Sequence, residues 1–287
     1  MSDKVVGVIG GSGLYELEGL TGVEEIRLST PFGDPSDSYI VGNLAGVKMV
    51  FLPRHGRGHR ILPSELNYRA NIWGMKKLGV TRIISVAACG SMRAEIKPGH
   101  LVVPDQFIDL SKGRVTTFFG DGIVAHMVYA DPICPHLADA LYNAGLAAGA
   151  TMHKGGAYLN MEGPQFSTRA ESNVYRSWGA SVIGMTNAPE AKLSREAEIC
   201  YATLALSTDY DCWHETEEDV SIEAVLAVMR ANIAKSKQVI TNAVPQIAEE
   251  RSCACKNALA GAIITDPKVI PHETKRRLEL IIGKYLP

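Results

Sequence analysis

The sequence lacks a long hydrophobic run and a strong net charge. No stretch approaches the roughly 18 uninterrupted apolar residues that a membrane helix needs. The apolar run at residues 5–9 is too short for a signal sequence and contains a glycine, so we expect neither export nor membrane insertion but a cytoplasmic protein. With 29 basic and 31 acidic residues the net charge is -2, which leaves no general field to attract nucleic acid. Any anion must therefore be bound by a local cluster of donors.

Cysteine is sparse and unevenly spaced, which excludes a small disulfide-stapled secreted fold and fits a reducing compartment. The one local pattern is Cys253-Ala-Cys255. Neighbouring thiols can exchange disulfides or ligate a metal, but buried cysteines are more often inert. Both interpretations remain open for this pair. The six cysteines are Cys89, Cys134, Cys200, Cys212, Cys253 and Cys255.

Short apolar runs alternate with helical patterns along the chain, which predicts an α/β fold. With no repeat or linker visible, we expect residues 1–287 to form a single domain, with C-terminal helices from about residue 221. A Ser64 cap and a glycine stop predict a helix over 64–78, and a Ser221 cap predicts a long amphipathic helix to about Val244. Further helices are predicted at 137–146 and 188–197, and strands at 5–9, 47–52, 82–88, 100–103, 180–185 and 199–207.

Gly10-Gly11-Ser12-Gly13 directly follows the first predicted strand. Without Cβ atoms, backbone N–H groups can approach an anion, and the Ser12 hydroxyl adds a donor. The pattern is no dinucleotide fingerprint, because Glu16 stands where a glycine is needed, and no lysine supplies a P-loop. A plain tight turn is the alternative.

The segment from Arg54 through His55 to Arg60 follows another predicted strand and holds three arginines and two histidines. These donors suit phosphate or carboxylate, and the carboxyl ends of strands are where open α/β sheets keep their ligands. A solvated basic loop is the competing interpretation. We expect anion binding.

Small residues at Ala87-Ala88-Cys89-Gly90-Ser91 end a third strand, where they leave room for a ligand and expose backbone donors. Cys89 has no paired base nearby in the sequence. An inert core cysteine is therefore preferred to a thiol nucleophile.

Asp209-Tyr210-Asp211 follows the apolar strand that ends near Ser207, and strand alternation is expected to point both carboxylates to one side. A carboxyl group in a partly apolar pocket has a raised pKa and can hold the proton that a departing purine needs at N7. A divalent-metal pair and a solvated turn are the alternatives.

Several motifs in register resemble the 5′-methylthioadenosine phosphorylase branch of the trimeric purine nucleoside phosphorylases. They are GGSGL, TPFGDPSD, RHG, NYRANIW, ACGS, EGPQFSTRAE, GMT and STDYDCW, and the likeness runs from about Val5 to about Ile247. The resemblance implies an α/β phosphorylase fold, with a twisted central mixed sheet flanked by helices, and assembly as a homotrimer or a dimer of trimers. It implies a nucleoside and inorganic phosphate as substrates, with no cofactor and no metal.

The resemblance also implies roles for matched residues. Asp209 and Asp211 would be catalytic at the polar edge of the purine. The adjacent subunit would contribute His126. Phosphate would be held by Ser12, Arg54, His55, the Ala88 backbone and Thr186, and the nucleoside by Phe166, Ser167, Met185, Val225 and Leu226. For Val225 and Leu226, packing in the core of the amphipathic helix is the competing explanation.

Three positions bear on specificity. Ala87 stands where many relatives have threonine, and Gly184 where some have asparagine. Relatives specific for 6-oxopurines usually place asparagine at position 209 and glutamate at 167, so Asp209 and Ser167 favour a 6-aminopurine. A phosphorylase of methylthioinosine, inosine or guanosine is the nearest alternative, and a non-catalytic nucleotide sensor is an alternative of another class.

Overall fold

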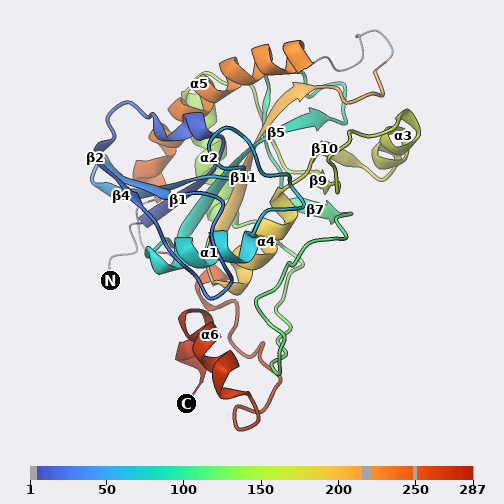
Figure 1. Ribbon diagram of the computed structural model, residues 1–287. Coiled ribbons are helices and arrows are strands. Elements are labelled where there is room, and N and C mark those ends of the chain that lie inside the picture. The colour runs from blue at the N-terminus through green and yellow to red at the C-terminus, as the bar shows by residue number, and fades with distance from the viewer. Residues whose placement is uncertain (1–4, 215–221, 248–250, 287) are drawn as a thin grey trace.

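The computed structural model describes residues 5–214, 222–247 and 251–286, except for the side chains of Ser12, Tyr15 and residues 222–227. An 11-stranded mixed sheet forms its centre, with helices on both faces (Figure 1), which confirms the predicted fold class. Its first eight strands lie in the order β2-β3-β4-β1-β5-β10-β9-β7, while β11 pairs with β5 and β6, and β6 pairs with β8.

The strands are short except for β5 and β11. The central ones are buried along nearly their whole length, as expected for a sheet covered on both faces. The strands are β1 (Val5–Gly10), β2 (Thr21–Ile26), β3 (Tyr39–Leu44), β4 (Val47–Pro53), β5 (Arg82–Ser91), β6 (Leu101–Val103), β7 (Gln106–Asp109), β8 (Met152–Lys154), β9 (Ala157–Asn160), β10 (Ala180–Gly184) and β11 (Cys200–Asp209).

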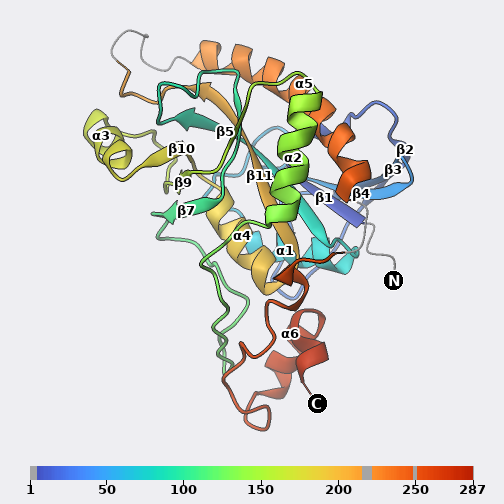
Figure 2. The same cartoon turned by 180° about the vertical axis from the view of Figure 1, so that it is seen from behind.

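Two layers of helices cover the sheet. The first, α1 and α4, lies in front in Figure 1, and the second, α2 and α5, lies in front in Figure 2. The short α3 packs beside β10, and α6 lies below the sheet. The helices are α1 (Tyr68–Lys77), α2 (Pro135–Ala147), α3 (Arg169–Ser177), α4 (Asn187–Glu196), α5 (Ile222–Ile247) and α6 (His272–Ile282). None of the described helices is long and apolar enough to cross a membrane.

The predicted start of α1 was wrong. The helix begins at Tyr68 and is capped by Asn67, whose side chain accepts a hydrogen bond from the Ala70 N–H at 3.1 Å. Ser64 lies in a preceding turn, in which the Glu65 N–H donates to the Leu62 carbonyl. Asparagine caps helices as well as serine does, and here the cap three residues further along the chain is the one used.

Four central strands run parallel to one another, since β1 pairs in parallel with β4 and β5, and β5 with β11. Their carboxyl ends therefore meet at one edge of the sheet. The four motifs singled out in the sequence lie at the carboxyl ends of these four strands. The topology alone brings them together.

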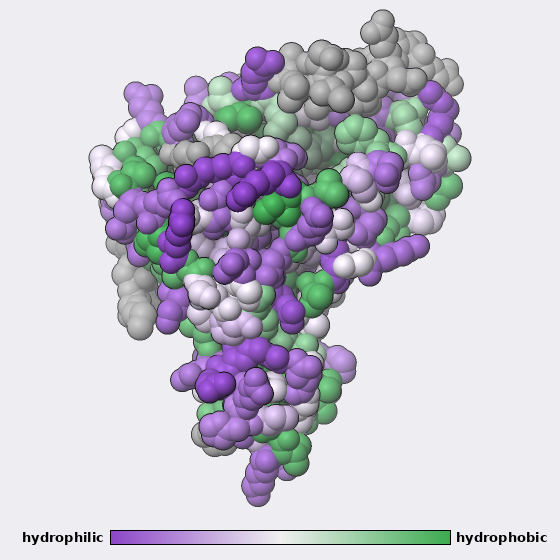
Figure 3. Space-filling model, in the orientation of Figure 1, coloured by the Kyte–Doolittle hydropathy of each residue, from purple (hydrophilic) through white to green (hydrophobic). Residues whose placement is uncertain are grey.

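Residues 111–130 and the segment from about Leu259 onward form an extension below the sheet (Figures 1 and 3). A bridge between Ala125 and Ile263 and a hydrogen bond from Thr274 to the Asp121 carbonyl join its two parts. Its surface carries exposed apolar side chains among polar ones, notably Val115, Val124, Val128, Ile264 and Val269.

Candidate functional site

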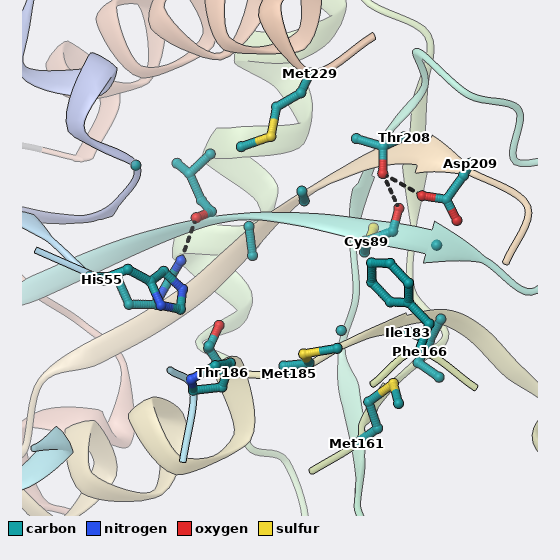
Figure 4. Close-up of a pocket in the computed structure, with 18 of the residues that line it drawn as sticks. His55, Cys89, Met161, Phe166, Ile183, Met185, Thr186, Thr208, Asp209 and Met229 are labelled. Atoms are coloured by element: carbon teal, nitrogen blue, oxygen red, sulfur yellow. Dashed lines mark hydrogen bonds between the residues drawn. The ribbon is translucent and has the colours of Figure 1, made fainter. Parts of the chain in front are cut away.

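A cavity of about 280 Å³ opens at the carboxyl edge of the parallel strands. Figure 4 shows His55 and Thr186 at one end, Asp209 and Phe166 at the other, and Met185 between them. The structure thus brings together eight of the residues predicted from the sequence, which are Arg54, His55, Ala88, Phe166, Met185, Thr186, Asp209 and Asp211.

Arg54 lies directly after β4 and is only 3% exposed. Its Nε donates to Glu190 Oε1 at 2.5 Å, and its Nη2 lies 3.1 Å from Glu190 Oε2 and 2.6 Å from Ser85 Oγ. Burial acts to lower the pKa of Arg54, but the Glu190 carboxylate outweighs it and raises the pKa. Nη1 donates to the Val86 carbonyl at 2.9 Å. Of the five guanidinium N–H groups, one on Nη1 therefore has no hydrogen-bond acceptor among the described residues.

His55 stacks on His59 with ring centroids 4.3 Å apart, and its Nδ1 lies 2.8 Å from the Ile61 carbonyl oxygen. Burial, together with the nearby Arg54 charge, lowers the pKa of His55 to about 4. The ring is therefore neutral at pH 7. Because a carbonyl only accepts, Nδ1 must carry the proton, which leaves Nε2 as an acceptor.

Backbone N–H groups add to this end of the cavity. Thr186 is the N-cap of α4, and its hydroxyl lies 3.1 Å from Asn187 Oδ1. The N-terminus of α4 carries partial positive charge toward the cavity lined by Thr186. Gly11 and Ala88 line the same cavity. Together with Arg54, these groups can hold a tetrahedral oxyanion.

Asp209 is the last residue of β11, at the opposite end of the cavity. Its Oδ2 accepts a hydrogen bond from Thr208 at 2.7 Å, and its Oδ1 accepts one from the Asp211 N–H at 2.8 Å. Burial raises the pKa of Asp209, although both hydrogen bonds oppose this effect. A buried carboxyl with a raised pKa is suited to hold or share a proton.

Asp211 also lines the cavity, but not for the reason predicted. β11 ends at Asp209, and Asp211 lies in the following turn with a left-handed backbone at φ 54°. The turn, not strand alternation, brings the two carboxyl groups to one cavity. Burial raises the pKa of Asp211, while hydrogen bonds with Ser172, the Cys212 backbone and Ser167 lower it.

The walls between the two ends are apolar. Met161, Ile183 and Met185 lie on one side, and Met229 of α5 reaches in from the other (Figure 4). Met161 and Met229 were not predicted as lining residues, because no motif marks them, whereas His59 and Thr208 lie within predicted motifs but were assigned no role. Glu190 was not predicted either, and its only signal was an acid one helical turn after Thr186.

Comparison with known proteins agrees with this geometry. The model of the Phosphorylase superfamily matches residues 5–245. The chain belongs to this superfamily. It is 65% identical over 285 residues to S-methyl-5′-thioadenosine phosphorylase of Geobacter sulfurreducens, covering 99% of this chain and 100% of that one. With the enzyme of that name from Synechocystis, the identity is 56% over 100% of this chain and 89% of the other.

Solved phosphorylases have the same fold. A methylthioadenosine phosphorylase from an antarctic soil metagenomic library superposes with a TM-score of 0.93 at 49% identity, covering 96% of this chain and 98% of the other. The methylthioadenosine phosphorylase of Schistosoma mansoni, solved in complex with adenine, gives a TM-score of 0.84 at 37% identity, covering 91% and 99%.

Two residues expected in this phosphorylase site, Ser167 and His126, are not among the described residues that line the cavity. Ser167 lies next to two lining residues, with its Oγ 3.9 Å from the Met161 sulfur and in a hydrogen bond with Asp211. His126 is exposed on the extension, where its N–H donates to the Ala262 carbonyl. Ser12, Val225 and Leu226 have side chains outside the described part of the chain, so their expected contacts stay predictions.

Position 184 differs from some phosphorylases for a steric reason. A Cβ on Gly184 would overlap the hydroxyl of Tyr158, whose ring is fully buried. Tyr158 thus occupies the space that a side chain at 184 would need. Ala87, the other departure, lines the cavity, where its methyl group offers no hydrogen bond.

Proposed function

We propose that this protein is an S-methyl-5′-thioadenosine phosphorylase, a pentosyltransferase that converts 5′-methylthioadenosine and phosphate into adenine and 5-methylthioribose 1-phosphate. Close full-length relatives support this activity. The observation that carries it is one cavity with oxyanion donors at one end and a carboxyl of raised pKa at the other. Phosphorolysis needs both.

At the phosphate end, the remaining Nη1–H of Arg54, the backbone at Gly11 and Ala88, and Thr186 bind the anion, with Ser12 as a further donor. Glu190 and Ser85 fix the guanidinium, so the donors are oriented before phosphate arrives. Such preorganisation places a phosphate oxygen against C1′ at little further entropic cost.

At the base end, the C1′–N9 bond breaks as a phosphate oxygen bonds to C1′. The electron pair passes into the purine, which accepts a proton at N7 from Asp209 and leaves as neutral adenine. Asp211 and Ser167 bind the polar edge of the base, and Phe166 covers its face. Asp209, held by Thr208 and the Asp211 N–H, is the general acid.

The sugar lies between these ends against Met185. Met229 gives the cavity an apolar wall on the α5 side, and Val225 and Leu226 belong to the same helix. An apolar wall favours a methylthio group over a hydroxyl by about 1–3 kcal/mol. The charges that the reaction needs come from side chains and backbone, so the proposal includes no metal or cofactor.

The chain further assembles as a homotrimer or a dimer of trimers, in which His126 completes the cavity of an adjacent subunit. Apolar side chains exposed near His126 support this interface, and Val128 is 80% exposed in the single chain. We expect a trimer or hexamer by light scattering. A monomer with full activity would contradict the role of His126.

A phosphorolysis panel tests the proposed function. Methylthioadenosine, adenosine, methylthioinosine and inosine are each incubated with and without phosphate, and free base and sugar phosphate are quantified. We expect adenine and 5-methylthioribose 1-phosphate from methylthioadenosine, only when phosphate is present. Equal rates without phosphate would indicate a hydrolase, preference for inosine would indicate a 6-oxopurine enzyme, and binding without turnover would indicate a sensor.

A further inference from the structure

Four of the six cysteines meet at one point, away from the cavity described above. The sulfur atoms of Cys134, Cys200, Cys253 and Cys255 all lie within 4.8 Å of one another. The closest printed pair, Cys200 and Cys253, is 3.3 Å apart. All four are free thiols.

Three segments far apart in the sequence supply these thiols. Cys134 is the N-cap of α2, Cys200 is the first residue of β11, and the other two flank the start of the short 3-10 helix Ala254–Asn257. Backbone bonding fixes the first two, since the Cys134 N–H donates to the Tyr201 carbonyl at 2.9 Å. The convergence is therefore a product of the tertiary fold, not of local sequence.

The distances suit a four-coordinate metal. A tetrahedral zinc ion with Zn–S bonds of about 2.3 Å requires sulfurs about 3.8 Å apart. That value falls between the 3.3 Å of the closest printed pair and the 4.8 Å limit of the cluster. Sub-ångström shifts of side chains would close the tetrahedron.

The surroundings compensate the charge of such a site. Four thiolates and one divalent cation carry a net charge of −2. Arg82 and Arg251 line the small cavity beside Cys134, Cys200 and Cys253. Cys134 also lies at the positive N-terminus of α2, which stabilises a thiolate. Two cations thus line the cavity beside the cluster, and one of its cysteines caps a helix N-terminus.

An ion could also reach this point. Cys253 is only half-buried, and the adjoining cavity of about 140 Å³ is lined by polar side chains including His136 and Ser252. The other three cysteines are buried. One accessible ligand beside three buried ones is an arrangement through which a metal can enter and then be shielded from water.

We propose that Cys134, Cys200, Cys253 and Cys255 form a structural tetrathiolate site for a thiophilic divalent cation such as zinc. Binding replaces four S–H protons by one cation, so four protons are released to solvent. The ion ties the segment from residue 251 onward to the amino end of β11. Asp209 lies at the other end of that strand, about 30 Å away at 3.3 Å per residue, so the site is separate from the proposed chemistry.

Metal content tests the proposal directly. The full-length chain, produced without a histidine tag, is reduced, stripped with a chelator and then titrated with zinc or cobalt. We expect one bound ion per chain, and for cobalt the visible absorption of a tetrahedral thiolate complex. Chelation should lower the melting temperature and zinc should restore it. Substoichiometric binding to the fully reduced protein would overturn the proposal, as would disulfides among these cysteines that form in preference to metal uptake.

Substitutions separate ligands from other thiols. Cys253→Ser and Cys255→Ser should each weaken zinc binding at least tenfold in a chelator competition. Cys212→Ser, which alters a half-buried thiol outside the cluster, is the matched control and should keep full stoichiometry. Undiminished affinity in both ligand variants would reject the site. If a variant fails to fold, the cobalt spectrum of the unaltered chain still decides.

Discussion

At the phosphate end of the cavity the charged side chain is buried and bound on nearly every side, whereas at the base end the acid is held by two hydrogen bonds beside an open wall. Arg54 is 3% exposed and paired with Glu190, while Phe166, at the same end of the cavity as Asp209 in Figure 4, is 65% exposed. The first arrangement fixes a permanent charge. The arrangement at the base end lets Asp209 hold a proton that it can give up. The exposed side chain of Phe166 beside it can be covered by a bound base or by a neighbouring subunit.

The difference teaches how one cavity can serve two kinds of chemistry. An anion is bound best by dipoles and charges that need no reorganisation, so its site is rigid. A general acid must change its protonation during the reaction, so its carboxyl is desolvated without a counter-ion. Placing a cation beside Asp209 would lower its pKa and remove the proton.

The largest expected effect comes from Asp209→Asn, which keeps the shape of the side chain but removes its transferable proton. Loss of a general acid costs about 10²–10⁴-fold in rate, so we expect adenine release to fall by at least 100-fold in steady-state assays with saturating phosphate. The control is Asp139→Asn, on the exposed surface of α2, which should turn over normally. An Asp209→Asn variant as fast as the control would eliminate the proposed acid.

Glu190→Gln should act on the phosphate end of the cavity, by lowering the stability of the folded protein. Removing one partner of a buried ion pair leaves an uncompensated charge, at a cost of about 3–5 kcal/mol. We expect the free energy of unfolding in urea to drop by that amount, and phosphate binding to weaken because Arg54 loses its orientation. Asp121→Asn, which breaks a salt bridge with Arg277 at the exposed surface, should change little. Equal stability of the two variants would mean that Glu190 does not hold the charge in place.

The smallest expected effect concerns pH. His55 has a pKa of about 4, so at neutral pH its free Nε2 accepts a hydrogen bond and cannot donate one. A bound phosphate must then bring a proton, either on its own oxygen or transferred to His55, whose pKa rises beside the anion. We expect the KM for total phosphate to rise several-fold as pH increases above 7, with proton uptake detected by calorimetry in two buffers. A KM that falls with pH would show that the bare dianion binds.

Much of the fold follows from local patterns in the sequence. Buried runs that stop at glycine or proline, such as 5–9 and 47–52, became strands β1 and β4 with nearly the expected bounds. The exposed strand β2 has no such pattern, since pairing with β3 alone defines it. The site was predictable where motifs follow parallel strands. It was not predictable where packing between distant segments places a residue, as for Glu190, which is 136 residues away from its partner Arg54 in the sequence.

The cysteines show the same limit. Cys253-Ala-Cys255 is visible in the sequence, and both inert thiols and metal ligation were compatible with it. Only the fold brings Cys134 and Cys200 to the same point, because α2 starts where β11 begins. Convergence of distant residues has no signature in a single sequence.

The contact between Gly184 and Tyr158 has a consequence for how such enzymes diverge. Because the phenol occupies the volume that a larger residue at 184 would fill, an asparagine there demands a smaller partner at 158. The smaller residue at 158 must therefore come before the larger one at 184, or together with it. Engineering a new sugar contact in this pocket therefore starts with the tyrosine, on β9, the strand that pairs with β10.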